Sequence, residues 1–136
     1  MIAFLDASAL IYLIEGREPW STAVKARLLE LEAVNPSAAV ALSRLSSLEC
    51  RVHPLRDGDE HALALFDAFF SKADLLWVEL SACVVDVATD LRARFGLRTP
   101  DALQAACCLQ LGPQAVLITG DATFARVPGL NVDVVA

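Results

Sequence analysis

Short apolar runs alternate with segments of helical periodicity along most of the chain, and this alternation restricts the fold more than any other feature. Strands are expected over residues 2–5, 39–42, 75–78, 115–119 and 130–135. Apolar residues recur every three or four positions between these runs, which indicates helices. Because parallel neighbouring strands need such crossover helices, the sequence predicts an α/β fold. We expect a three-layer α/β/α sandwich around a mostly parallel sheet of about five strands.

The ends of the expected helices are marked by glycine, proline and capping residues. Gly16 and Gly96 are expected to end two helices, and a third ends near Pro54. Thr99 fits the N-cap of a helix that has Pro100 in its first turn. There is no linker, internal repeat or low-complexity stretch, so residues 1–136 are expected to form a single domain.

Composition excludes some classes of protein. Hydrophobic residues make up 56% of the chain, more than the roughly 45–50% of an average soluble protein, so part of the surplus is expected at a protein interface. Charged residues interrupt every apolar stretch before it reaches the roughly 18 residues of a membrane span. No basic region precedes the first apolar run, which argues against a signal peptide. We therefore expect a cytoplasmic protein.

The net charge and the spacing of histidines and cysteines limit which nucleic-acid and metal sites the chain can form. The net charge of −6 is the wrong sign for broad attraction to nucleic acid, so an RNA-binding site would need cations to supply the attraction locally. His53 and His61 have no carboxylate at metal-ligand spacing and are expected to be surface or core residues. The cysteines lack zinc-site spacing and are expected to be reduced and mostly buried: Cys50, Cys83, Cys107 and Cys108.

Four acidic residues are the informative feature. Asp6 and Asp121 each follow a strand directly, which places both at the carboxyl edge of a parallel sheet, where ligands bind. Glu49 and Asp101 lie on helices whose near ends could face the same edge. Two carboxylates about 5 Å apart repel by on the order of 3 kcal/mol at an effective dielectric near 20, so such a cluster must bind cations, take up protons or accept a basic side chain. Oxygen ligands of this kind favour Mg²⁺ or Mn²⁺, which can activate water for attack on a phosphodiester.

Each acid also has an ordinary structural explanation, which the residues alone leave open. Asp6 and Asp121 could cap the helices that follow them, and Asp101 could be a first-turn residue favoured by the helix dipole. Glu49 could be a solvated residue paired with Arg44 or Arg51.

Four segments occur in a characteristic order: Phe4-Leu5-Asp6-Ala7-Ser8-Ala9-Leu10, residues 42–49 ending in Leu48-Glu49, Thr99-Pro100-Asp101-Ala102-Leu103-Gln104-Ala105-Ala106, and Leu117-Ile118-Thr119-Gly120-Asp121-Ala122-Thr123-Phe124. In order and spacing they resemble the PIN domain family, and within it the VapC-type toxins of toxin–antitoxin pairs. Any one segment is a weak signal, but four in order are a strong one. The resemblance covers essentially the whole chain.

The resemblance implies an endoribonuclease that depends on Mg²⁺ or Mn²⁺ and acts as the toxin of a toxin–antitoxin pair. The four acids match the family's catalytic and metal-binding residues, and two hydroxyl residues match those that support the pocket: Asp6, Glu49, Asp101 and Asp121, with Ser8 and Thr119. Local capping is an equally open explanation of the hydroxyls. Gly120 departs from the family pattern, which typically has Asn or a charged residue at this position.

The resemblance also implies an RNA substrate, a homodimer and a cognate antitoxin whose C-terminal segment lies in a groove between helices. Four aromatic residues are candidate anchors for that groove or for the dimer, although core packing is expected for at least two of them: Trp20, Phe66, Phe69 and Phe70. Three arginines near the motifs are candidates for contact with RNA phosphates: Arg17, Arg98 and Arg126.

Alternatives to a nuclease remain at this point. A haloacid-dehalogenase-like phosphatase also has an Asp after its first strand but needs a second Asp two residues later, where Ser8 stands. A catalytically inactive PIN-like module would bind a metal or a partner without turnover. A receiver-like module would need a lysine late in the chain, and the last lysine is Lys72.

Overall fold

The computed structural model describes residues 1–135, and these residues form an all-parallel sheet of five strands in the order β3-β2-β1-β4-β5. β1 (Ile2–Leu5) is central, between β2 (Ala39–Ser43) and β4 (Ala115–Thr119). The edge strands are short: β3 (Leu76–Val78) and β5 (Val132–Val134). The predicted α/β fold is confirmed, with β5 shorter than the predicted run over 130–135.

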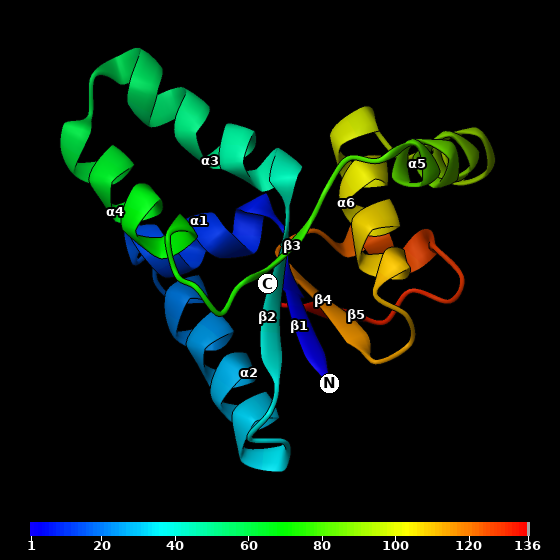
Figure 1. Cartoon of the computed structure of the whole chain (residues 1–136), viewed down its shortest axis with the longest axis horizontal. Coiled ribbons are helices and arrows are strands. Elements are labelled where there is room, and N and C mark those ends of the chain that lie inside the picture. The colour runs from blue at the N-terminus through cyan, green and yellow to red at the C-terminus, as the bar shows by residue number, and fades with distance from the viewer. Residues whose placement is uncertain (136) are drawn as a thin grey trace.

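Helices cover both faces of this sheet, as Figure 1 shows. On one side are α1 (Ala7–Glu15), α2 (Trp20–Val34), α3 (Arg44–Asp57) and α4 (Glu60–Phe70). On the other side are α5 (Ala82–Phe95), α6 (Thr99–Gln110) and the short 3-10 helix η1 (Ala122–Arg126). The arrangement is the predicted three-layer sandwich. No helix within residues 1–135 is long and apolar enough to cross a membrane.

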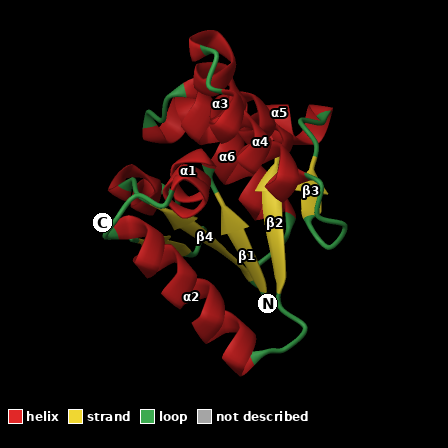
Figure 2. Ribbon diagram, turned by 90° about the vertical axis from the view of Figure 1, so that its left-hand side faces the viewer, coloured by secondary structure: helices red, strands yellow, loops and turns green. Residues whose placement is uncertain are grey.

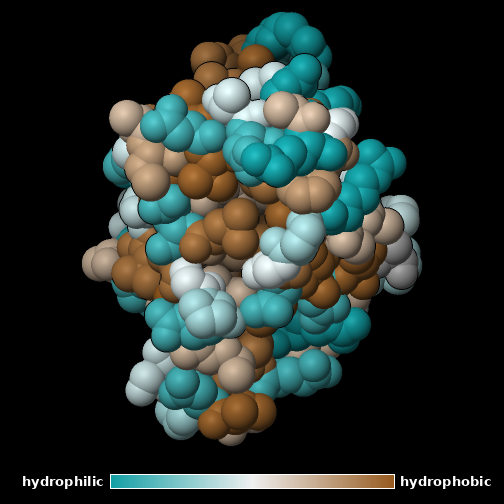
Figure 3. Space-filling model, turned by 90° about the vertical axis from the view of Figure 1, so that its right-hand side faces the viewer, coloured by the Kyte–Doolittle hydropathy of each residue, from teal (hydrophilic) through white to brown (hydrophobic). Residues whose placement is uncertain are grey.

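Alternation along β1 divides the core into two halves. Ile2 and Phe4 belong to the cluster under α5 and α6, whereas Ala3 and Leu5 belong to the cluster under α1, α2 and α4. Successive side chains of a strand point to opposite faces, so a strand that is buried on both faces must be apolar throughout. On the outer surface over α5 and α6, hydrophobic and hydrophilic residues are interspersed (Figure 3).

Two helix boundaries differ from the sequence predictions. α3 does not end near Pro54 but continues to Asp57, and Gly58 in the left-handed conformation ends it. The N-cap of α6 is Arg98 rather than Thr99, and the Arg98 side chain makes no capping hydrogen bond within residues 1–135. Thr99 is instead the first helical residue, so α6 begins one residue earlier than expected.

The strand order reverses between β1 and β4, and the crevice of such a sheet is the region beyond the carboxyl ends of these two strands. After β1 the chain adds β2 and β3 on one side, and it then crosses to add β4 and β5 on the other. In such a sheet the connections leave β1 and β4 toward opposite faces, and ligands bind beyond the carboxyl ends of these two strands. Figure 2 shows helices beyond the arrowheads that mark those ends. Asp6 follows β1 and Asp121 lies two residues after β4, so both border this crevice.

Candidate functional site

Asp6 is the most buried acid at the crevice. It is 5% exposed and is also the N-cap of α1. Its Oδ1 accepts hydrogen bonds from the Ala9 backbone N–H at 2.9 Å and from Ser8 Oγ at 2.7 Å. Its Oδ2 accepts a hydrogen bond from Thr119 Oγ1 at 2.5 Å. The capping explanation is therefore correct, but it uses only one of the carboxylate's two oxygens.

The ionised form of Asp6 is unfavourable in this position. Burial raises the pKa of its carboxyl above the ordinary value, and the negative charge of Glu49 raises it further. The hydrogen bonds from Thr119, Ala9 and Ser8 act in the opposite direction but do not cancel the effect of burial. A cation beside Asp6 would remove this cost.

Ser8 and Thr119 join the end of β1 to the end of β4. Besides donating to Asp6, Ser8 Oγ accepts from the Gly120 N–H at 3.0 Å, and Thr119 Oγ1 accepts from the Asp121 N–H at 3.0 Å. The two hydroxyl oxygens lie 3.5 Å apart. Both side chains therefore contact Asp6 and hold the loop that carries Asp121. Their role is more than local capping.

Asp101 and Asp121 line one pocket of about 250 Å³, together with Arg98 and Arg126. Asp121 caps η1 by accepting from the Thr123 N–H at 2.9 Å. Asp101 lies in the first turn of α6, where Arg98 Nε donates to its Oδ2 at 3.2 Å. The pocket thus combines two carboxylates with two guanidinium groups.

Glu49 is half-buried on α3, and its partner is not an arginine. Its Oε1 accepts from Gln104 Nε2 at 2.9 Å. The suggested ion pair with Arg44 or Arg51 is wrong, because those side chains have partners elsewhere. Arg44 binds both oxygens of Glu79 and lies over the Trp77 ring, and Arg51 binds Ser47 and reaches Asp67 at 3.5 Å.

The four acids lie in two pairs and do not form a single metal-binding cluster. The negative charge of Glu49 raises the pKa of Asp6, and Asp101 lines the same pocket as Asp121. Within residues 1–135, no three acidic, histidine or cysteine side chains are arranged as a metal-binding group. The chemistry of the donors nonetheless fits a hard divalent cation, because all four are carboxylates and the most buried one carries an uncompensated cost when ionised.

Two neighbouring features were not predicted from the sequence. Gln104 contacts Glu49, which is 55 positions away in the sequence. In the sequence alone it cannot be distinguished from an ordinary helix residue. Tyr12 of α1 lies against Gly120, where an added Cβ would be 2.6 Å from its hydroxyl oxygen. The departure from the family pattern at Gly120 was a signal for this second contact, but it did not indicate which residue fills the space.

The candidate aromatic anchors differ in exposure. Phe66 is completely buried in the core, and Phe69 and Phe70 are partly buried against the same cluster. Trp20 remains exposed at the start of α2 and stacks on Tyr12, with ring centroids 5.2 Å apart. The expectation that core packing accounts for at least two of the four is met by Phe66 together with the partly buried Phe69 and Phe70.

The sequence model of the PIN domain family matches residues 3–130, and the chain therefore belongs to the PIN domain family. Among solved structures, it is similar to VapBC2 from Rickettsia felis bound to a DNA fragment from its promoter, at a TM-score of 0.75 and 23% identity over 98% of both chains. It is also similar to VapBC-1 from nontypeable Haemophilus influenzae, at a TM-score of 0.74 and 20% identity over 99% of this chain and 98% of that one. A toxin–antitoxin complex from Klebsiella pneumoniae matches at a TM-score of 0.68 and 26% identity over 98% of both chains. No curated protein matches the chain.

Proposed function

We propose that this protein is a VapC-type toxin, an endoribonuclease that depends on Mg²⁺ or Mn²⁺ and cleaves RNA phosphodiester bonds. The observation that carries the proposal is the buried Asp6 at the crevice between β1 and β4, held by Ser8 and Thr119. A protein that only needed to cap α1 would not need to bury a second carboxylate oxygen there. PIN domains are generally nucleases, which agrees with this chemistry.

Asp6, Glu49, Asp101 and Asp121 are the proposed ligands of the cation. A bound Mg²⁺ or Mn²⁺ would supply Lewis acidity toward the phosphate and lower the pKa of water in the pocket. The chain's own groups orient this chemistry. The hydroxyls of Ser8 and Thr119 hold Asp6, and the Asp121 N–H is held by Thr119 Oγ1. Arg98 and Arg126 border the same pocket and are suited to bind phosphate oxygens of the RNA.

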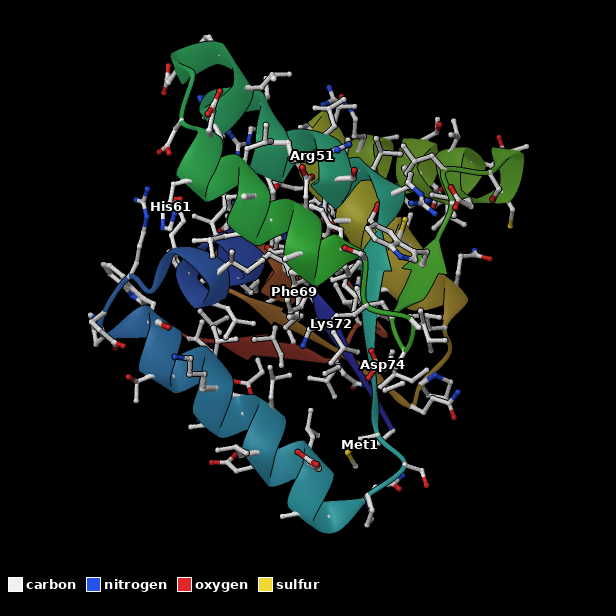
Figure 4. All side chains as sticks on the ribbon, turned by 60° about the vertical axis from the view of Figure 1, so that its left-hand side comes forward. Met1, Arg51, His61, Phe69, Lys72 and Asp74 are labelled. Atoms are coloured by element: carbon white, nitrogen blue, oxygen red, sulfur yellow. The ribbon has the colours of Figure 1, made fainter. Side chains whose placement is uncertain are left out.

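The proposed partner is a cognate antitoxin. The similar solved structures include VapBC pairs and a toxin–antitoxin complex, which supports this assignment. A groove of about 700 Å³ lies between α1, α2 and α4 and is lined mainly by apolar side chains such as Leu13, Leu28 and Leu65. Phe69 and Lys72 lie along it in Figure 4. Its composition suits a short amphipathic segment of the antitoxin.

A homodimer is part of the same proposal. α3 exposes three large apolar side chains at positions i, i+4 and i+7, namely Leu48, Val52 and Leu55. An apolar stripe of this kind on a helix suits contact with another protein surface. We propose that the protein acts in the cytoplasm, where its RNA substrate and antitoxin would be present.

RNA cleavage by variants of the acids tests the proposal. Asp6→Asn and Asp101→Asn should each abolish cleavage of a synthetic single-stranded RNA in Mg²⁺ or Mn²⁺, with unchanged circular dichroism. Asp90→Asn is the control, because Asp90 is exposed on α5, where it pairs with Arg94. Cleavage by wild type should stop in EDTA. Retained cleavage in both site variants would contradict the assignment, and metal binding without any cleavage by wild type would instead indicate an inactive metal-binding module.

A further inference from the structure

Gln104 is a buried polar side chain of α6 that contacts α3. It is 2% exposed, and its neighbours on the buried face of α6 are small residues such as Ala105 and Cys108. Its Nε2 donates to Ser46 Oγ and to Glu49 Oε1, both at 2.9 Å, and both acceptors are on α3. The two N–H groups of the amide are therefore both used.

The carbonyl end of the same amide is unsatisfied. Gln104 Oε1 is buried and has no hydrogen-bond partner within residues 1–135. The amide cannot be turned around to relieve this, because its oxygen would then face the Glu49 carboxylate, which only accepts hydrogen bonds when ionised. An apolar side chain of similar length would fill the volume without an unpaired oxygen. Only the two hydrogen bonds to α3 can therefore make the amide more favourable here than an apolar side chain.

Glu49 has room to move unless something holds it. It is half-buried, its charge acts on Asp6, and it also lines a second cavity of about 270 Å³ with Glu15, Arg17 and His53. Turning into that cavity would take the carboxylate away from Asp6 and toward a mixed set of charges that also includes Asp57 and Asp59. The hydrogen bond to Oε1 opposes it and leaves Oε2 without a hydrogen-bonded partner in the described part of the chain.

We propose that Gln104 is a positioning residue that holds Glu49 Oε1 from α6 and leaves Oε2 free as a ligand for the divalent cation of the neighbouring acids. This inference rests on the proposed function, because it concerns the same cation. It adds a residue that contacts neither the cation nor the RNA. Groups that orient metal ligands in this way typically change metal affinity by about 10- to 100-fold when they are removed.

Calorimetric titration with Mn²⁺ tests this proposal, because it measures metal affinity and does not depend on RNA cleavage. Gln104→Met keeps the length of the side chain and removes the amide, and we expect it to weaken Mn²⁺ binding by about tenfold or more. Ser46→Ala is the matched control, because it removes the other acceptor of Gln104 and leaves the contact with Glu49 intact. We expect Ser46→Ala to change Mn²⁺ affinity by less than about threefold, within the usual scatter of such effects.

A double-mutant cycle separates positioning from packing. In a Glu49→Ala background, Gln104→Met should have no further effect on Mn²⁺ affinity, since the carboxylate that it orients is gone. Thermal unfolding of each variant without Mn²⁺ checks that it is folded, because Gln104→Met also leaves Ser46 Oγ and Glu49 Oε1 without their donor.

The outcomes for the nuclease and for Gln104 are distinguishable. Wild-type protein that binds Mn²⁺ while Gln104→Met binds it equally well would overturn the role of Gln104 and leave the nuclease proposal standing. An equal loss of affinity in the Glu49→Ala background would overturn it too, because the effect would then not pass through Glu49. If wild type binds no Mn²⁺, both proposals fail. Absence of RNA cleavage together with the expected affinities would contradict only the nuclease.

Discussion

The hydroxyl of Tyr12 occupies the space that a side chain at Gly120 would need. A Cβ added to Gly120 would lie 2.6 Å from Tyr12 Oη and 2.7 Å from its ring carbon Cε2. The ring cannot move aside without cost, because it stacks on Trp20. The loop that follows β4 therefore passes close to α1, and this approach brings the Gly120 N–H within 3.0 Å of Ser8 Oγ.

Gly120→Ala should consequently destabilise the protein by about 1–3 kcal/mol, the usual cost of overpacking a core. The cause is the ring and not the backbone, since the φ of Gly120 is not in the left-handed region. In a Tyr12→Leu background the same substitution should cost little. Urea unfolding of the four proteins measures this coupling. Equal costs of Gly120→Ala in the two backgrounds would show that the contact with Tyr12 does not limit this position.

The strands and the positions of two acids could be predicted from the sequence because they depend on local pattern and on topology. The apolar run over 115–119 is a buried strand, and the acid that follows it lies at the ligand-binding edge in any parallel sheet. Asp6 is placed by the same argument. These predictions needed no knowledge of which helix packs against which.

Contacts between distant helices could not be predicted in that way. The sequence offered arginines on α3 as partners of Glu49, but Gln104 reaches it from α6 because α3 and α6 meet beyond the sheet edge. Likewise, Arg27 of α2 binds Asp133 of β5 at 2.7 Å, although the two residues are far apart in the sequence. Such pairs depend on how the helices are placed in three dimensions, and no pattern in a single sequence indicates that placement.

The cysteines provide a direct test of the packing around the sheet. Cys50, Cys107 and Cys108 are buried and Cys83 is exposed, so the expectation of mostly buried, unpaired cysteines is confirmed. Burial raises the pKa of the three buried thiols, that of Cys108 to about 12. A thiol reagent at pH 8 should therefore modify one cysteine per native chain rapidly and all four after unfolding. Cys83→Ser should remove the rapid phase, and a second rapid phase would contradict the packing described.

Arg98 and Arg126 should contribute to RNA binding much more than to stability. Arg98 is 80% exposed at its side chain, so its ion pair with Asp101 is worth less than about 1 kcal/mol. In an Asp6→Asn background, which allows binding without cleavage, replacing both arginines with alanine should weaken RNA binding. It should also lower the slope of log Kd against log salt by about 1.4, or about 0.7 for each lost phosphate contact.

Arg94→Ala is the matched control for that experiment, because Arg94 is an exposed arginine of α5 that pairs with Asp90 outside the pocket. It should leave the salt dependence unchanged. Fluorescence anisotropy with a labelled single-stranded RNA at several salt concentrations measures both quantities. If Arg94→Ala has the same effect as the double substitution, the two pocket arginines contribute only general charge.

Asp6 should lower the stability of the protein when no divalent cation is present. Because its pKa in the folded state lies above the ordinary 3.8, the folded protein holds this proton more tightly than the unfolded chain does. The free energy of unfolding must then fall as pH rises through the interval between these two values, and the full cost is present above it. In EDTA at pH 7.5, Asp6→Asn should therefore unfold at a higher urea concentration than wild type. The advantage should shrink as pH falls through that interval and disappear below about 3.8, where the carboxyl becomes protonated in the unfolded state as well.

Divalent cations should reverse that order, since a ligand that binds only the folded state stabilises it by about 2.7 kcal/mol at a hundred times its Kd. Mn²⁺ should raise the unfolding midpoint of wild type and have little effect on Asp6→Asn. The rise in Mn²⁺ should be smaller for Ser8→Ala than for wild type, because the substitution removes one of the hydrogen bonds that hold the ionised carboxylate in place. Urea unfolding in EDTA and in Mn²⁺ measures all three proteins. If Asp6→Asn is the less stable protein in EDTA, the hydrogen bond from Thr119 outweighs the cost of the buried charge, and Asp6 is then first of all a structural residue.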